Sequence, residues 1–261
     1  MHSPLILLTN DDGIHAPGLD ALQRALAPLG RVVVYAPDQE RSAVGHGISL
    51  HHPLRVKQLR EGWHMVNGTP ADCVLLAVRK LLGERPLLVV SGINNGPNLG
   101  DDVTYSGTVA GAREAMLLGV PAMAVSMTAY QPRHWDTGGA VALELARRLL
   151  DSGLPPETLL NVNVPDLPNA ELAGMALTVM GRRTYDDDII HRTDPRGGDY
   201  YWIGGTATLD FEGPDTDLEA VTKGYVSITP IQRDCTHHNY LAELRQSPPV
   251  LGAAPPSGDP S

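Results

Sequence analysis

Short hydrophobic runs alternate with helical patterns through the first part of the chain. The continuous aliphatic runs are "LILLTN", "RVVVYAP", "PLLVVSG", "VPAMAVSM" and "LLNVNVP". Runs of this kind predict strands that are buried on both faces of a sheet. Between them lie stretches with apolar residues at helical spacing, namely "GLDALQRALAPLG", "TPADCVLLAVRKLLG", "SGTVAGAREAMLLG" and "TGGAVALELARRLLDSG". This order predicts an α/β fold with a mostly parallel sheet covered by helices on both faces.

Helix boundaries can be predicted at two of these stretches. In the first, Leu19, Leu22 and Leu26 are spaced as on one helix face, and Gly30 is a stop signal. In the second, Thr69 is a candidate N-cap with Pro70 at the first helical position. The segments "ISLHHPLRV" and "GWHMVNG" are expected to be extended.

The composition changes after about Pro165. Residues 176–205 are rich in polar, aromatic and turn-forming residues, which predicts strands and hairpins, and "KGYVSITPIQ" predicts a further strand. The tail, residues 246–261, is rich in Pro, Gly and Ser and is expected to be disordered. We therefore divide the chain into a core (1–165), a β-rich arm with a C-terminal oligomerisation segment (166–245) and a disordered tail (246–261).

Composition and charge argue against two functional classes, proteins that bind duplex nucleic acid and membrane proteins. Of 261 residues, 42% are hydrophobic, which is enough for a sizeable core, and the formal net charge is -10. Such a balance argues against electrostatic binding of duplex nucleic acid, which needs clustered Lys and Arg. The chain shows no signal-peptide pattern and no membrane-length apolar run, and its two cysteines form no motif. We expect a soluble cytoplasmic protein that does not associate with membranes.

Polar residues follow three of the predicted strands. Asp11 and Asp12 come directly after the first, the segment 37–46 follows the second, and the segment 93–102 follows "LLVVSG". In parallel sheets ligands bind beyond the carboxyl ends of the strands, so these loops are expected to converge. Their carboxylates, amides and hydroxyl are hard oxygen ligands suited to Mg²⁺, Mn²⁺ or Ca²⁺, and a cation would offset the repulsion between Asp11 and Asp12. Alone, Asp-Asp-Gly is more typical of an ordinary polar turn than of a metal site, but its position after the first buried strand, with polar loops after the next ones, favours the metal site.

The third loop leads to Ser106-Gly107-Thr108, which opens an apolar helix. A helix N-terminus has unpaired N–H groups and is a ready anion site, although Ser106 or Thr108 can also serve only as a cap. A cation site beside a helix N-terminus suggests a phosphoryl substrate. The dinucleotide motif GxGxxG and the P-loop are both absent. His46 lies between two glycines and is either a substrate-loop residue or an ordinary surface histidine.

Five segments together resemble the SurE family, the survival-protein nucleotidases. They are "TNDDG", "APDQERSAVGHGIS", "GTPADCV", "VSGINNGPNLGDDVTYSGTVAGA" and "GYVSITP", in the family's order over residues 4–232. The resemblance implies a Rossmann-like three-layer sandwich with a β-hairpin arm and a swapped C-terminal segment, assembled as a homodimer or homotetramer. It also implies a divalent-metal-dependent phosphatase with one Mg²⁺, Mn²⁺ or Co²⁺ per subunit, acting on nucleoside monophosphates. The expected activity is that of a 5'-nucleotidase, with 3'-nucleotidase and exopolyphosphatase activity on short polyphosphate as extensions.

The same resemblance implies the site residues. Asp11, Asp12, Ser42 and Asn94 match the metal ligands, and Asp11 and Asp12 are the candidate catalytic residues. The positions matching the substrate and phosphate pocket are Asn10, Asn98, Ser106, Gly107 and Thr108.

Two questions stay open at this point: which group attacks the phosphate, and whether the protein is an enzyme at all. We favour direct attack by water over an aspartyl-phosphate intermediate, because a carboxylate committed to a metal is a poorer nucleophile. The alternative from another class is a metal-dependent nucleotide-binding regulator without turnover.

Overall fold

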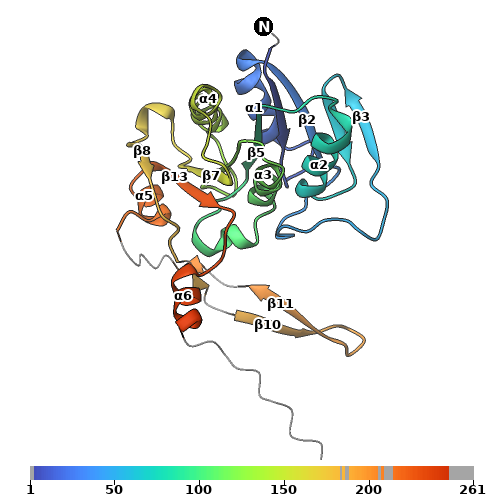
Figure 1. The fold of residues 1–261 in the computed structure, drawn as a ribbon. Coiled ribbons are helices and arrows are strands. Elements are labelled where there is room, and N and C mark those ends of the chain that lie inside the picture. Colours follow the sequence, from blue (N-terminus) through green and yellow to red (C-terminus); the bar gives the residue numbers. More distant parts are fainter. Residues whose placement is uncertain (1–2, 183, 186–187, 205–206, 209–213, 247–261) are drawn as a thin grey trace, which may run out of the picture.

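The computed structural model describes residues 3–182, 184–185, 188–204, 207–208 and 214–246. Within this part of the chain the largest sheet has nine strands in the order β3-β4-β2-β1-β5-β6-β7-β13-β8 (Figure 1). From β4 to β7 all neighbours run parallel, whereas β3 and β13 run antiparallel to β4 and β7. The strands are β1 (Leu5–Thr9), β2 (Arg31–Pro37), β3 (Val56–Arg60), β4 (Trp63–Val66), β5 (Leu88–Asn94), β6 (Ala122–Met127), β7 (Thr158–Val164), β8 (Gly174–Leu177) and β13 (Tyr225–Gln232).

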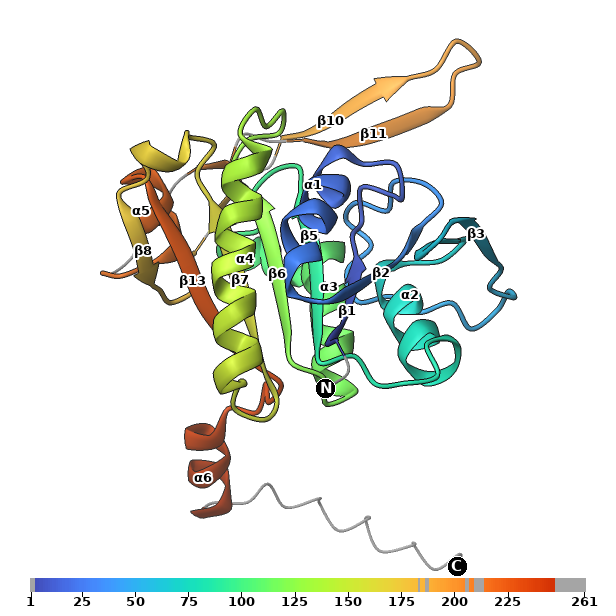
Figure 2. The same ribbon diagram turned by 90° about the horizontal axis from the view of Figure 1, so that it is seen from above.

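Two pairs of helices cover the two faces of the sheet (Figures 1 and 2). On one face lie α1 (Pro17–Leu26) and α4 (Trp135–Ser152), and on the other lie α2 (Pro70–Leu76) and α3 (Gly107–Leu117). Side chains of β1 alternate between the two cores: Ile6 packs with the α1/α4 core and Leu7 with the α2/α3 core. The predicted α/β fold with three layers is therefore confirmed.

The predicted helix boundaries follow local chemistry. Thr69 caps α2 by accepting from Asp72 N, and the Asp72 carboxylate accepts from Thr69 N in return. The helix continues as a π-helical segment, Ala77–Leu81. The first helix ends earlier than Gly30, because Pro28 has no N–H and the chain tightens into a 3₁₀ turn over Ala27–Leu29.

The segment expected to be extended before Val56 is mostly irregular. Strand β3 begins only at Val56, three residues after Pro53, which cannot donate to a strand partner. The second extended segment forms β4, as expected.

The C-terminal third adds to the main sheet and also builds the arm. Strands β13 and β8 extend the sheet beyond residue 165, and α5 (Asp217–Thr222) lies against β13. The predicted hairpin is present as β10 (Asp188–Thr193) paired with β11 (Asp199–Gly204), which projects away from the core (Figure 2). A second short pair joins β9 (Thr184–Tyr185) to β12 (Ala207–Thr208).

The short α5 and the terminal helix α6 (His238–Gln246) were not predicted from the pattern. The division at residue 165 and the oligomerisation role of 166–245 stay predictions. Apart from Gln246, the tail lies outside the described residues. In the part of the chain that the structure describes, no helix is long and apolar enough to cross a bilayer.

Candidate functional site

The three polar loops that follow β1, β2 and β5 meet at one edge of the sheet. Arg41 N, in the loop after β2, donates to Asp11 O at 2.7 Å. Asn95 N, directly after β5, donates to Asp12 Oδ2 at 3.1 Å. The expected convergence beyond the carboxyl ends of these strands is therefore what the structure shows.

Asp11 is a buried carboxylate packed against the start of α3. Thr108 donates its hydroxyl hydrogen to Asp11 Oδ1, and a Cβ on Gly107 would lie 2.8 Å from Asp11 Oδ2. Only glycine allows the helix to come this close. Burial raises the pKa of Asp11, and the hydrogen bond from Thr108 opposes that rise by favouring the charged form.

Asp12 is less buried and is held by one neighbour. Asn95 donates to it twice, from its backbone N at 3.1 Å and from Nδ2 at 3.0 Å. Burial and then the charge of Asp11 raise the pKa of Asp12 to about 6, although the Asn95 bonds act in the opposite direction. A cation beside these two adjacent carboxylates would lower both pKa values and favour the ionised forms.

Asn10 closes the turn that presents these aspartates. Its Nδ2 donates to Gly13 O at 2.9 Å, and Gly13 has a φ of 97°, a conformation that favours glycine. Asn10 Oδ1 is buried and lacks a hydrogen-bond partner among the described residues. A buried acceptor of this kind is costly unless something else binds it, so Asn10 keeps one atom for a ligand.

Ser42 lies in an exposed part of the second loop. Its hydroxyl donates to Glu40 Oε1 at 2.7 Å, while the preceding residue, Arg41, binds the backbone of Asp11. The negative charge of Glu40 contributes to the raised pKa values of both aspartates. The backbone hydrogen bond of Arg41 thus places Ser42 near the two aspartates, although no hydrogen bond joins Ser42 to either carboxylate in the structure as described.

Asn94 is the last residue of β5 and faces the same edge. Its Nδ2 donates to Gly96 O at 2.9 Å. With the amide nitrogen used in this way, the remaining polar atom of the side chain is the carbonyl oxygen Oδ1. That is the atom a hard cation would require.

Asn98 lies in a buried amide network below the third loop. Its side-chain Nδ2 donates to Ser126 Oγ at 2.8 Å. Its backbone carbonyl oxygen accepts from Nδ2 of Asn161 at 2.8 Å and from Nδ2 of Asn163 at 3.0 Å. Asn98 N donates back to Asn163 Oδ1 at 2.8 Å. These contacts fix the backbone of the loop, and the expected phosphate contact of Asn98 stays a prediction.

The end of the third loop is also anchored. Gly100 N donates at 2.9 Å to the buried carboxylate of Asp217 on α5, which accepts in addition from Gly181 N at 2.8 Å. Ser106 then caps α3 by accepting from Val109 N at 3.0 Å. The Ser106 and Thr108 hydroxyls are therefore both in use inside the protein. The Ser106 N–H donates to Asp102 O at 3.1 Å and the Thr108 backbone hydrogen-bonds to Asp11, so a phosphate at this helix end would meet the N–H of Gly107.

The residues fit a divalent cation by the chemistry of their donors. Neither Asp11 nor Asp12 forms an ion pair with a Lys or Arg in the structure as described. Among the described residues, no group of three or more His, Cys, Asp or Glu is arranged so that it could hold a metal ion. A cation here would depend on two carboxylates completed by neutral oxygens, for which Ser42 and Asn94 are available.

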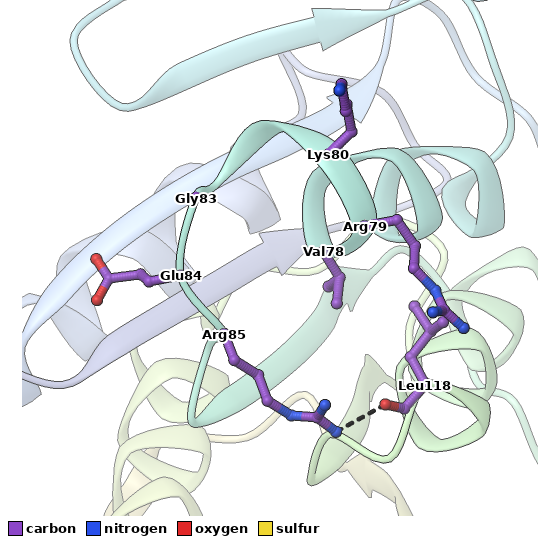
Figure 3. A pocket seen from close by; sticks show the side chains of 7 residues that line it. All are labelled: Val78, Arg79, Lys80, Gly83, Glu84, Arg85 and Leu118. Atoms are coloured by element: carbon purple, nitrogen blue, oxygen red, sulfur yellow. Dashed lines mark hydrogen bonds between the residues drawn. The ribbon is translucent and has the colours of Figure 1, made fainter.

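A pocket of about 380 Å³ lies away from this site, between the chain that follows α2 and the C-terminal end of α3. It is lined by Val78, Arg79, Lys80, Gly83, Glu84, Arg85 and Leu118 (Figure 3). Arg85 donates to Leu118 O at 2.7 Å just past the end of α3, and Lys80 and Glu84 point away from the other side chains. Arginines commonly bind the free carbonyls at a helix C-terminus, which accounts for Arg85.

Two residues of the site were missed by sequence reasoning. Asn95 holds Asp12, and Glu40 adds negative charge and binds Ser42. Asn95 is adjacent to Asn94 and Glu40 is two residues before Ser42, so a search for amides and carboxylates within two residues of each predicted ligand would have found them.

Comparisons with known proteins identify the family of this chain. Residues 6–187 match the family model described as "Survival protein SurE". The chain is 52% identical over 259 residues to the "5'-nucleotidase SurE" of Geobacter sulfurreducens, covering 98% of each chain. It is also 52% identical over 243 residues to the protein of that name from Geobacter metallireducens, covering 92% of this chain and 96% of the other.

A solved structure shares the fold. The SurE protein from Aquifex aeolicus superposes with a TM-score of 0.84 at 41% identity, covering 94% of this chain and 99% of that one. The family model, the sequence identities and the fold all agree. The chain therefore belongs to the SurE family.

Proposed function

We propose that this protein is a divalent-metal-dependent 5'-nucleotidase that hydrolyses nucleoside monophosphates to nucleoside and phosphate. The observation that carries the proposal is the Asp11–Asp12 pair, in which Asp11 is buried against the N-terminus of α3 and Asp12 is partly buried, without a cationic partner among the described residues. Such a pair suits a cation, and the helix end beside it suits a phosphate. The relatives' name, 5'-nucleotidase SurE, supports this reaction.

Asp11, Asp12, Ser42 and Asn94 would hold one Mg²⁺, Mn²⁺ or Co²⁺ ion. When bound, such an ion supplies positive charge that stabilises the phosphoryl group as its bond to the leaving oxygen breaks. The Thr108 hydroxyl orients Asp11 and favours its ionised form by donating to it. Asn95 does the same for Asp12.

We assign phosphate binding to the N-terminal end of α3 and activation of the attacking water to one aspartate. At the start of α3, Ser106 N donates to Asp102 O at 3.1 Å and the Thr108 backbone hydrogen-bonds to the Asp11 carboxylate, so Gly107 N is the backbone group of this turn that would bind a phosphate oxygen. Ser106 and Thr108 flank it, with Asn10 and Asn98 as the remaining pocket residues. Asp12 is the more exposed aspartate, so we assign to it the alignment of the attacking water and acceptance of its proton.

The arm supports assembly into a homodimer or homotetramer. Its strands β10 and β11 carry exposed apolar side chains, among them Ile189 at 64%, Trp202 at 65% and Ile203 at 92% exposure. Apolar surface of this kind is typical of interaction sites. Light scattering after gel filtration would give the number of subunits.

The test is phosphate release from a panel of substrates by metal-stripped protein. The panel contains 5'-AMP, 5'-GMP, 5'-CMP, 5'-UMP, 3'-AMP and tripolyphosphate, each with Mg²⁺, Mn²⁺ or Co²⁺ and with EDTA as the control. We expect metal-dependent release that is fastest with 5'-monophosphates, and slower release from 3'-AMP and polyphosphate. Binding of 5'-AMP without release under any metal would favour the regulatory alternative.

A further inference from the structure

The loop that carries Ser42 has little apolar packing to hold it. We define the Ser42 loop as residues 38–49, most of which are exposed, including Val44 at 37% and Ile48 at 47%. Burial of these side chains therefore contributes little to its position. Polar contacts have to keep Ser42 near the aspartates.

Backbone contacts hold this loop on both sides of Ser42. On one side, Arg41 N donates to Asp11 O at 2.7 Å. On the other, Gly45 N donates to Tyr105 O at 3.0 Å. Tyr105 directly precedes the cap of α3, so the loop crosses the start of that helix.

One side-chain contact joins the loop to the body of α3. His46 Nε2 lies 2.8 Å from Glu114 Oε2, and the side chains are 28% and 11% exposed. Because a carboxylate can only accept, His46 is the donor. Glu114 is six residues after Thr108, about 9 Å farther along the helix axis at the usual rise per residue.

The same helix fixes Asp11 through Gly107 and Thr108. Helix α3 thus contacts Asp11 directly and binds the Ser42 loop through Glu114, at a point nearer to Ser42 than the far end of the loop. That far end is held separately at the start of α2, where Asp72 accepts from Ser49 and Thr69 donates to Gly47 O. A bond to a rigid helix lowers the number of conformations the loop samples, and a preorganised ligand binds a metal more tightly.

We propose that His46 is a positioning residue whose hydrogen bond to Glu114 holds the Ser42 loop on α3, so that Ser42 is placed to complete the metal site with Asp11. This inference rests on the proposed function, since it gives Ser42 its role as a ligand. It adds a residue outside the ligand set that acts through the loop and touches neither metal nor substrate.

The test measures metal affinity without turnover, by calorimetric titration of the metal-stripped protein with Mn²⁺. In His46→Ala we expect the Kd for Mn²⁺ to rise roughly tenfold, the lower end of the usual effect of residues that support metal ligands. His46→Gln is the conservative control, because its amide can still donate to Glu114, and we expect it to recover most of the affinity. Adding Glu114→Ala to His46→Ala should raise the Kd no further, because both changes break one contact.

A second readout follows the loop itself in the absence of metal. Trypsin cleaves after Arg41, and the fragment beginning at Ser42 can be followed by mass spectrometry. We expect this cut to be faster in His46→Ala than in wild type and in His46→Gln, with thermal unfolding midpoints that agree closely among the three.

Two results would overturn the proposal in distinguishable ways. Wild-type Mn²⁺ affinity in His46→Ala would refute the positioning role and leave the metal site intact. Failure of the wild-type protein to bind Mn²⁺ would refute the metal site itself, and the role of His46 with it.

Discussion

Thr108 donates its hydroxyl hydrogen to Oδ1 of Asp11, and this bond ties the first turn of α3 to the end of β1. The two elements are far apart in the sequence. Their contact places a carboxylate, which has to stay charged, against a helix end that would receive phosphate. One donor therefore links the two halves of the proposed site.

Removing the Thr108 hydroxyl should weaken metal binding at the site without leaving a cavity. Thr108→Val keeps the shape of the side chain but loses the hydroxyl, so the charged form of Asp11 loses a hydrogen bond worth about 1.5–3 kcal/mol. We expect weaker Mn²⁺ binding and an acidic limb of the pH–activity profile shifted to higher pH. Thr108→Ser, which retains the hydroxyl, is the matched control, and an unchanged acidic limb in Thr108→Val would contradict the assignment.

The two aspartates should be essential for activity while the fold tolerates their amides. Asp11→Asn and Asp12→Asn remove charge with little change of volume, and loss of several kcal/mol of transition-state stabilisation would lower kcat/KM by roughly a thousandfold. Phosphate release from 5'-AMP with Mn²⁺ measures this, and circular dichroism checks the fold. Ser42→Ala should lose less, because a neutral hydroxyl is a weaker ligand.

Asp12 should make the metal-free protein less stable as pH rises. Its pKa is about 6 in the folded chain and 3.8 ordinarily, so between these values the folded state binds more protons than the unfolded state. The contribution of Asp12 to the free energy of unfolding is therefore fully present below pH 3.8 and is lost as pH rises through 6.

The direction of this pH dependence of stability can be checked with the Asp12→Asn variant in EDTA. Above pH 6 we expect the variant to unfold about 2–4 °C higher than wild type, which corresponds to about 1 kcal/mol for a domain of this size. The difference should shrink towards pH 4, where Asp12 is protonated in wild type. Asp151→Asn, at an exposed carboxylate near the end of α4, is the control and should show no such trend.

The close approach of Gly107 to Asp11 predicts a specific effect of a single methyl group. In Gly107→Ala the new Cβ would meet Asp11 Cβ and Oδ2 at 2.8 Å, so the carboxylate has to move. We expect Mn²⁺ affinity and activity to fall more than stability does. Gly111→Ala, on the same helix, would meet Thr9 and Ser91 and should lower the unfolding midpoint with less effect on Mn²⁺ affinity.

The sequence predicted the layers of the fold because its signals were strong and local. The aliphatic runs of β1, β2 and β5 and the cap at Thr69 each depend on neighbours in the chain. The convergence of three loops then followed from the rule for parallel sheets. What local reasoning did not give were α5, α6 and the late start of β3, where the apolar signal is weak or Pro53 intervenes.

Side-chain partners were the harder part to predict. That Asn95 holds Asp12, and that the Asn98 amide donates to buried Ser126, depends on which way each amide turns after the loop has folded. His46 was left between two interpretations, because its partner Glu114 lies 68 positions away in the sequence. Contacts across such distances are set by tertiary packing, and no local pattern reports them.

The central claim is that Asp11 and Asp12 hold a divalent cation required for hydrolysis of nucleoside monophosphates. The most direct measurement is phosphate release from 5'-AMP by metal-stripped protein, titrated with Mn²⁺. The account predicts no release in EDTA, saturable activation that reaches its maximum at one ion per chain, and no activation of Asp12→Asn. Release that continues undiminished in EDTA, or wild-type activation of Asp12→Asn, would contradict it.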